Sequence, residues 1–363
     1  MRPFDRLTAL VGAIVQSNSE RVAALMDDDD GEALIGVAVR HKCAGMIVRA
    51  VTESGRRAPR WTTALRRVAA LALSDNIALM KQAAIAAAAL EAARLDHAFL
   101  KGLARLRAGD TTASFTHHYD IDILIRPEAA EAAERALIGI GYVEEFGAPA
   151  ALWYRSHHHH LVPLVIMDQK PVELHVAFAP AKQFGITTNW AALRSHIVRR
   201  EDTAHEWTLD PLARAVHVMV HGLKSGRLYD FALLAMLLRD HPTLAEELRA
   251  WLGTAVSHPA ISVAFAAANR LRGAETAATR KTLNHLRWID RREDLPAWLR
   301  ARAHFVDAWH TNGGTLFGAA TRESVARLLP LEKPTPAAVT LLAARTAGRA
   351  AASLAAAAIT GLR

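Results

Sequence analysis

Three acidic residues stand inside apolar segments, where together they could hold a metal ion. Asp120 and Asp122 are separated by one residue in the apolar segment 119–125, and Glu173 lies in a second such segment, residues 172–176. Successive side chains of a strand point to opposite faces, so the two aspartates share one face. Charged groups are rarely buried without a partner, and this pattern therefore predicts a divalent cation among the three carboxylates.

Such a cluster suits the transfer of a phosphoryl or nucleotidyl group. Carboxylates can hold two divalent ions about 4 Å apart, which stabilise the attacking and the leaving oxygen. Magnesium prefers oxygen ligands and completes its shell with substrate phosphates, so we expect Mg²⁺, or Mn²⁺ in its place. Glu173 is also a candidate to accept the proton of an attacking hydroxyl.

The same residues have alternative explanations. Asp120 could cap the start of a strand and Asp122 could pair with a surface arginine. An Asp-x-Asp motif also occurs by chance and in glycosyltransferases that use sugar nucleotides. His175 shares a face with Glu173, and we expect it to fill a position in the core.

Histidines add two further candidates for the site. A run of four leads directly into a predicted strand, so its alternate members should face opposite sides, and a four-histidine metal centre is not expected. His217 and His221 lie one helical turn apart, but no glutamate follows His217 as a zincin motif requires, and buried, hydrogen-bonded histidines are the favoured interpretation. The run consists of His157, His158, His159 and His160.

The elements that must position the acids form a small mixed sheet with helices. A short strand at residues 97–100 leads into Lys101 and Gly102 and a short helix, and the strand at 119–125 follows. Arg126 and Pro127 open a helix that continues to about residue 138. Further strands are predicted at residues 142–146, 159–167 and 171–178.

Helices flank this sheet on both sides in the sequence. The first part of the chain reads as several helices, one of which has Leu73, Ile77 and Ala84 at helical spacing behind a start signal at Ser74. After the sheet, helices are predicted at residues 211–220, 230–238, 243–252, 262–271, 276–289 and 296–309, and from about 336. We therefore expect an α+β fold with a helical region at 1–95, a catalytic α/β core at 96–180 and a second helical region at 181–363.

Composition sets the cellular context. The chain has 363 residues, is 51% hydrophobic, and carries a formal charge of +8, which favours anionic partners. Its single cysteine, Cys43, allows no internal disulfide and suits a reducing compartment. The apolar segment 350–362 is shorter than a membrane span requires. The apolar segment 7–15 resembles the core of a signal peptide, but no small-residue cleavage site follows it, and it is interpreted as a helix. A cytoplasmic protein without a membrane span is expected.

Several short motifs together resemble those of the uncharacterised nucleotidyltransferase family, which is related to polymerase-β-like enzymes. They are Leu100-Lys101-Gly102, Asp120-Ile121-Asp122-Ile123-Leu124-Ile125 followed by Arg126-Pro127, Gly141-Tyr142, and Val172-Glu173-Leu174-His175. More loosely, His217, His221 and Asp230 match a helical His/His/Asp pattern of the family. The resemblance implies that Asp120, Asp122 and Glu173 hold the metal, and that Lys101 and Gly102 lie beside the triphosphate. The chain departs from the superfamily in having Lys-Gly where Gly-Ser or Gly-Gly is usual.

The leading prediction is a magnesium-dependent nucleotidyltransferase. It would move a nucleoside monophosphate from a triphosphate such as ATP to an acceptor and release pyrophosphate. The acceptor remains open among a small molecule, a peptide, a protein and an RNA. Two rivals are a metal-dependent glycosyltransferase and a degenerate transferase domain that acts as a scaffold or binds nucleic acid through basic helices.

Overall fold

The computed structural model describes residues 3–26, 31–55, 59–145, 158–179 and 183–274. The chain divides into two compact units, one of residues 1–143 and 159–286 and the other of residues 144–158 and 287–363. Almost all of the second unit lies outside the described residues. The predicted helices at 276–289, at 296–309 and from about 336 also lie outside them.

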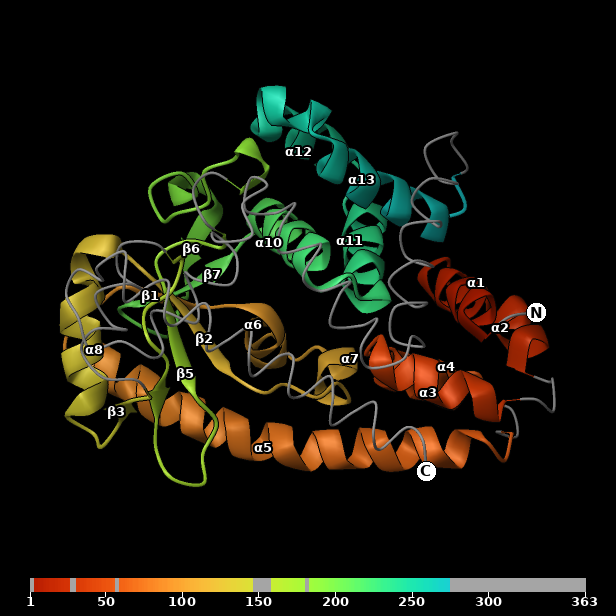
Figure 1. The fold of residues 1–363 in the computed structure, drawn as a ribbon, viewed down its shortest axis with the longest axis horizontal. Helices are drawn as coiled ribbons and strands as arrows, with labels where there is room; N and C mark the ends of the chain where they lie inside the picture. Colours follow the sequence, from red (N-terminus) through yellow and green to blue (C-terminus); the bar gives the residue numbers. More distant parts are fainter. Residues whose placement is uncertain (1–2, 27–30, 56–58, 146–157, 180–182, 275–363) are drawn as a thin grey trace, which may run out of the picture. The chain divides into compact units, whose positions relative to one another are not determined.

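The N-terminal part of the chain is helical, as predicted. Four short helices precede a long one, α5 (Thr62–Ala92), which runs along one side of the unit beneath both α3 and α4 and the sheet (Figure 1). The four short helices are α1 (Pro3–Val15), α2 (Ser19–Met26), α3 (Glu32–Arg40) and α4 (Ala44–Glu53).

Helix α5 differs from its prediction in where it starts and in which face it buries. No helix begins at Ser74, because α5 continues through this position from Thr62. Leu73 and Ile77 are 37% and 53% exposed, whereas Leu65, Leu79 and Leu90 on the other side are buried. By length and composition α5 is also apolar enough to cross a membrane, and 33% of its most apolar window is buried within the protein.

A seven-stranded mixed sheet adjoins α5. Its strand order is β3-β4-β5-β2-β1-β7-β6, with β1 antiparallel to β2, and β2 parallel to β5. The strands are β1 (His97–Phe99), β2 (Ile121–Ile125), β3 (Val143–Glu144), β4 (Leu164–Val165), β5 (Val172–His175), β6 (Ile197–Arg199) and β7 (Glu206–Leu209). The helices between them are α6 (Lys101–Arg107), α7 (Thr111–Ser114) and α8 (Ala130–Ile138), with short 3-10 turns at Pro127–Ala129, Gln183–Gly185 and Arg194–His196.

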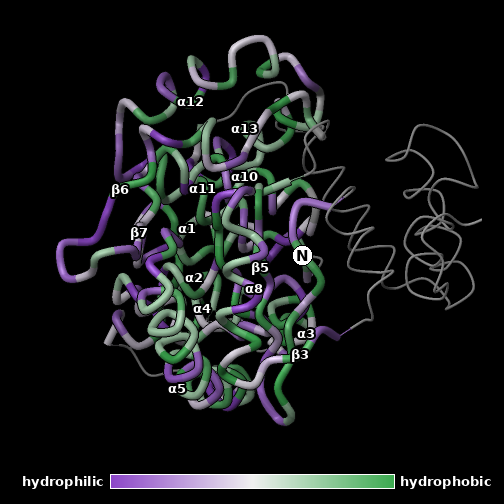
Figure 2. The backbone as a smooth tube through the Cα atoms, turned by 90° about the vertical axis from the view of Figure 1, so that its left-hand side faces the viewer, coloured by the Kyte–Doolittle hydropathy of each residue, from purple (hydrophilic) through white to green (hydrophobic). Residues whose placement is uncertain are grey.

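The sheet lies between two hydrophobic clusters, because both of its faces carry apolar side chains. Ile121, Ile123 and Ile125 of β2 pack with α5 and α8, whereas Leu124 belongs to the cluster that contains α10 and α11. Figure 2 shows hydrophobic segments (green) along the inner helices and a hydrophilic stretch (purple) around β6 and β7. Asp122, at the alternate position to the isoleucines, therefore faces the α10 side.

The helices after the sheet confirm their predicted positions. They are α10 (Pro211–Ser225), α11 (Leu228–Asp240), α12 (Leu244–Leu252) and α13 (Pro259–Leu271), with a 3-10 turn at Gly253–Ser257. Helix α10 starts where the Asp210 side chain accepts a hydrogen bond from the Ala213 N–H at 2.8 Å, and it ends at Gly226, whose φ of 65° is left-handed.

Five strands of the sheet were predicted, and each is shorter in the structure. The predictions were residues 97–100, 119–125, 142–146, 159–167 and 171–178. Strands β6 and β7 were not predicted. They complete the sheet beside β1, where β7 runs parallel to it. The architecture is the predicted α+β fold, with a small mixed sheet flanked by helices.

Candidate metal and nucleotide site

Strand pairing brings two of the predicted acids together. Asp122 of β2 lies directly opposite Glu173 of the parallel strand β5. Asp120 comes just before β2, and Asp122 is only 2% exposed. A charge this deeply buried requires compensation by nearby cations or polar hydrogens.

Lys101 supplies part of that compensation. Its Nζ lies 2.5 Å from Asp122 Oδ1 and 3.7 Å from Asp120 Oδ2. Lys101, which was expected to lie beside the triphosphate, thus forms an ion pair with the aspartates in this structure. Burial opposes the charge on Lys101, but the aspartates and Glu173 raise its pKa above the ordinary value.

His175 links the two strands through its ring. Its Nε2 lies 2.7 Å from Asp122 Oδ1 and 3.4 Å from Glu173 Oε2. The histidine is buried, as predicted for a core residue, but its polar contacts place it within the acidic centre. The rings of His159 and His160 lie 5.4 and 5.2 Å from its ring, so two of the four histidines of the run reach this neighbourhood. His157 lies outside the described residues.

The two aspartates and His175 titrate differently because their neighbours differ. Burial and the neighbouring Asp122 raise the pKa of Asp120 to about 6. Burial acts in the same direction on Asp122, but Lys101 and His175 hold its pKa well below the ordinary value. Burial lowers the pKa of His175, and its hydrogen bonds to Asp122 and Glu173 reverse this effect and raise the pKa overall.

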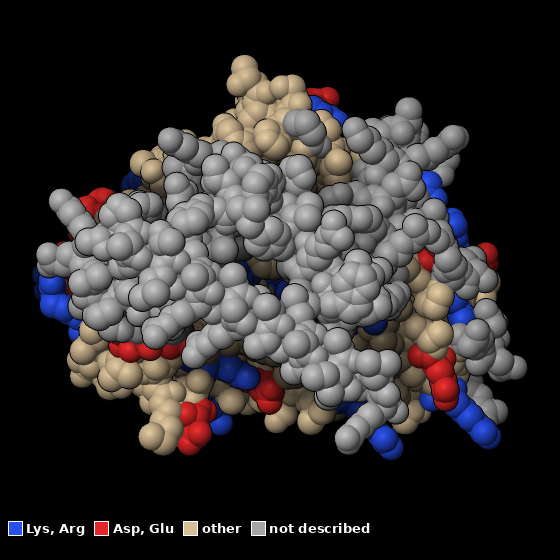
Figure 3. All heavy atoms as spheres, viewed as in Figure 1, with Lys and Arg blue, Asp and Glu red and all other residues tan. Residues whose placement is uncertain are grey.

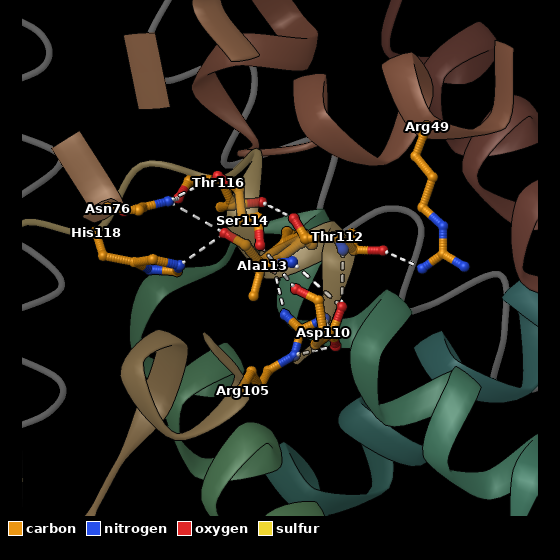
Figure 4. A network of polar contacts seen from close by, with 10 residues as sticks. Arg49, Asn76, Arg105, Asp110, Thr112, Ala113, Ser114, Thr116 and His118 are labelled. Atoms are coloured by element: carbon orange, nitrogen blue, oxygen red, sulfur yellow. Dashed lines mark hydrogen bonds and ion pairs between the residues drawn. The ribbon is translucent and has the colours of Figure 1, made fainter. Parts of the chain in front are cut away.

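The segment between α6 and β2 is fixed by a polar network (Figure 4). Asp110 caps α7 through the Thr112 N–H at 2.8 Å and pairs with Arg105 at 2.6 Å. The Asn76 amide donates to the carbonyl oxygens of Ser114 and Thr116 at 2.9 and 2.8 Å. This network holds the backbone immediately before the Asp-x-Asp motif.

His118 at the end of this segment explains Gly102. The His118 ring bonds to the Ala113 carbonyl through Nε2 at 3.1 Å and lies over the backbone of residue 102. A Cβ on Gly102 would come within 1.9 Å of His118 Cε1. Gly102 is therefore required by close packing as α6 begins beside the site.

A cavity of about 490 Å³ opens beside the acidic centre. Asp120, Asp122, Lys101 and Gly102 line it, whereas Glu173 and His175 are not among its lining residues. Its other walls come from α10, α11 and the turn between α3 and α4. They contribute Lys42, Arg214, His217, His221, Arg227 and Asp230, among others.

The two histidines of α10 have different partners. His221 Nδ1 lies 3.2 Å from Asp230 Oδ2, as expected for a paired histidine. His217 is 5% exposed and packs on Phe178 with the ring centroids 4.6 Å apart. Burial, followed by the nearby charge of His221, lowers the pKa of His217 well below the ordinary value. His217 is therefore neutral at neutral pH.

Sequence reasoning missed Lys42 in the basic wall of the cavity, although the loop after His221 with Arg227 was considered as a phosphate contact. Lys42 Nζ donates to the His117 carbonyl at 3.2 Å and lies 5.0 Å from the Tyr119 ring centroid, and burial followed by the charge of Arg227 lowers its pKa. The His41 ring and carbonyl accept hydrogen bonds from the first N–H groups of α11, which brings this turn beside Arg227. No local motif marks such a long-range contact.

The acidic centre fits a divalent ion by its donor atoms. One ligand atom each from Asp122, Glu173 and His175 lie within 4.8 Å of one another. Carboxylate oxygens suit magnesium and manganese, and an imidazole nitrogen suits the transition metal better. Asp120 is outside this set of three but is joined to it through Lys101.

Comparison with known proteins agrees with this chemistry. The model of a family described as uncharacterised nucleotidyltransferase matches residues 27–272, which include helices α3 to α5, the whole sheet and helices α10 to α13. No curated protein and no solved structure gives a match. The match covers more than half of the chain and every residue of the site, and the protein belongs to this nucleotidyltransferase family.

Proposed function

We propose that the protein transfers a nucleoside monophosphate from a nucleoside triphosphate to an acceptor, with a divalent metal ion held by Asp120, Asp122 and Glu173. The observation that supports this most strongly is the in-register pairing of Asp122 with Glu173 on parallel strands, with Asp120 and Lys101 beside them at the wall of a cavity. A cavity of about 490 Å³ is within the range typical of small-ligand sites.

The metal, magnesium or manganese, would neutralise charge on the phosphates when bound. The protein's own part is to fix the carboxylates. Asp122 is held by its strand and by His175, and Asp120 is the more exposed of the two aspartates, with 35% of its side chain accessible. These positions support a site that is preorganised at Asp122 and adjustable at Asp120.

Unpaired cations in the cavity support a polyphosphate as the substrate. Among the described residues, Lys42, Arg214 and Arg227 line the cavity and have no carboxylate within ion-pair distance. Burying like charges near one another is unfavourable unless an anion binds between them. A triphosphate supplies such an anion, with Lys101 and Gly102 beside it.

The reaction needs one bond to form and one to break. An acceptor oxygen attacks the α-phosphorus, the bond from that phosphorus to the bridging oxygen breaks, and pyrophosphate leaves with the electron pair. Glu173 holds the ion through one carboxylate oxygen, and its other oxygen accepts the proton of the attacking hydroxyl, with 21% of its side chain accessible. The acceptor itself stays open.

Replacing Asp122 by Asn tests the proposal. The neutral amide removes one metal ligand and the partner of Lys101, so we expect at least about a hundredfold loss of transfer. The assay follows label from α-phosphate-labelled ATP, CTP, GTP or UTP into components of a cell extract. Asp202→Asn is the matched control, because Asp202 is 66% exposed and pairs only with Arg200 among the contacts described. Equal transfer by the Asp122 and Asp202 variants would refute the mechanism.

Two rival functions predict other results with the same protein. A glycosyltransferase would be stabilised against heat by UDP-sugars rather than by nucleoside triphosphates. A non-catalytic scaffold would show no metal-dependent nucleotide binding and would bind RNA or DNA with strong salt dependence. Among the described residues visible in Figure 3, acidic and basic side chains are mixed along the margin.

A further inference from the structure

The ammonium group of Lys101 lies between the two aspartates of the Asp-x-Asp motif. The Nζ distances of 2.5 Å to Asp122 and 3.7 Å to Asp120 make it a shared cation for both. The backbone holds it there, since Lys101 has a φ of 49°, in the left-handed region that residues other than glycine rarely adopt. Strain of this kind persists where surrounding structure imposes it, and it is commonest at functional sites.

Neighbouring contacts impose this conformation. The Leu100 N–H donates to the Asp122 carbonyl at 2.9 Å, which fixes the residue before Lys101 against β2. On its other side, Gly102 is packed against His118. The contacts of Leu100 and Gly102, on either side of Lys101, therefore direct its side chain at the carboxylates.

A second set of donor atoms shares Asp122 with this ion pair, since Asp122 Oδ1 contacts both Lys101 Nζ and His175 Nε2. Asp122, Glu173 and His175 each offer one ligand atom within 4.8 Å of the others. His175 Nε2 faces both carboxylates, and its Nδ1 lies 3.4 Å from the Ala177 carbonyl. In this structure the Nε2–H donates to the carboxylates, and an ion held by the two acids would replace that proton and take the Nε2 lone pair while Nδ1 keeps its proton toward Ala177.

We propose that this centre binds a single divalent ion, for which His175 replaces Asp120 as the third ligand beside Asp122 and Glu173, and that the Lys101 ammonium takes the place of a second ion between Asp120 and Asp122. The inference rests on the proposed function. The three carboxylates are neutralised by one divalent ion and one ammonium when His175 is neutral. A second divalent ion on the same two aspartates would lie against the ammonium and be repelled.

Manganese binding to the full chain tests the inference without measuring activity. The bound Mn²⁺ is counted by electron paramagnetic resonance, alone and with a non-hydrolysable nucleoside triphosphate analogue whose own Mn²⁺ binding is subtracted. We expect one Mn²⁺ per wild-type chain and no magnetic coupling between neighbouring Mn²⁺ ions. Lys101→Met should bind two coupled ions, whereas Lys101→Arg should retain one.

Lys81→Met is the control, because it removes an exposed lysine of α5 that does not line the cavity and should leave the count at one. A coupled pair of ions in the wild type would overturn the inference while leaving metal-dependent transfer intact. A single ion in a folded Lys101→Met variant would overturn it too. If the wild type binds no Mn²⁺ at all, both this inference and the proposed function fail.

Discussion

At the scale of single residues, the site depends on a few positions that tolerate little change. The acids could be predicted from sequence because period-two alternation in a strand marks a shared face. The partners of those acids could not, because contacts of Lys101 and His175 with Asp122 depend on which strands pair and in what register. Gly102 shows the same limit. Glycine is needed there because the His118 ring packs against it, and the sequence does not reveal that contact.

Gly102→Ala should destabilise the protein by about 1–3 kcal/mol, because its Cβ would overlap the His118 ring and force a shift at the start of α6. Urea unfolding followed by circular dichroism measures the change. Gly36→Ala in α3 is the control: nothing lies within 4 Å of its Cβ, so the gain in helix propensity should stabilise the protein by about 0.5–1 kcal/mol. Equal changes in the free energy of unfolding for Gly102→Ala and Gly36→Ala would contradict the packing argument.

At the scale of elements, the sequence pattern was informative where one face of an element is clearly apolar and the other polar. Strand β5 and helices α8 and α10 satisfy this condition and were predicted, and β2 was predicted from its apolar run. Strands β6 and β7 are short and are joined by a charged segment, residues 199–202, so no apolar run marked them. In α5, alanine and leucine occur on both faces, so hydrophobicity alone did not identify the buried face.

His97 gives strand β1 a pH-dependent stability. It is fully buried, and burial lowers its pKa below the ordinary value of 6.5. The unfolded chain therefore takes up a proton before the folded chain as the pH falls. The stabilisation is present above about pH 6.5 and is lost as the pH falls through the lowered pKa.

We expect the free energy of unfolding of the wild type to decrease between about pH 7.5 and about pH 5.5 by more than that of His97→Gln, which keeps a polar side chain but does not titrate. Chemical denaturation at both pH values measures the difference. Parallel pH dependences in the two proteins would show that His97 is not responsible.

At the scale of the whole molecule, the cavity is assembled from parts that are far apart in the sequence. The acids come from the sheet, Lys42 from the turn between α3 and α4, and His217, His221 and Arg227 from α10 and the turn after it. The family model spans all of these parts. The helices around the sheet therefore line the cavity, with His217, His221 and Asp230, which the resemblance to the family had already singled out, among the lining residues.

Parallel reactions with triphosphates labelled at the α- or the γ-phosphate test the central claim most directly. With magnesium or manganese present, the account predicts that α-label becomes bound to the acceptor while γ-label leaves as pyrophosphate, and that removal of the metal by a chelator stops both events. Transfer of γ-label to the acceptor, or transfer of α-label that continues without metal, would contradict the account.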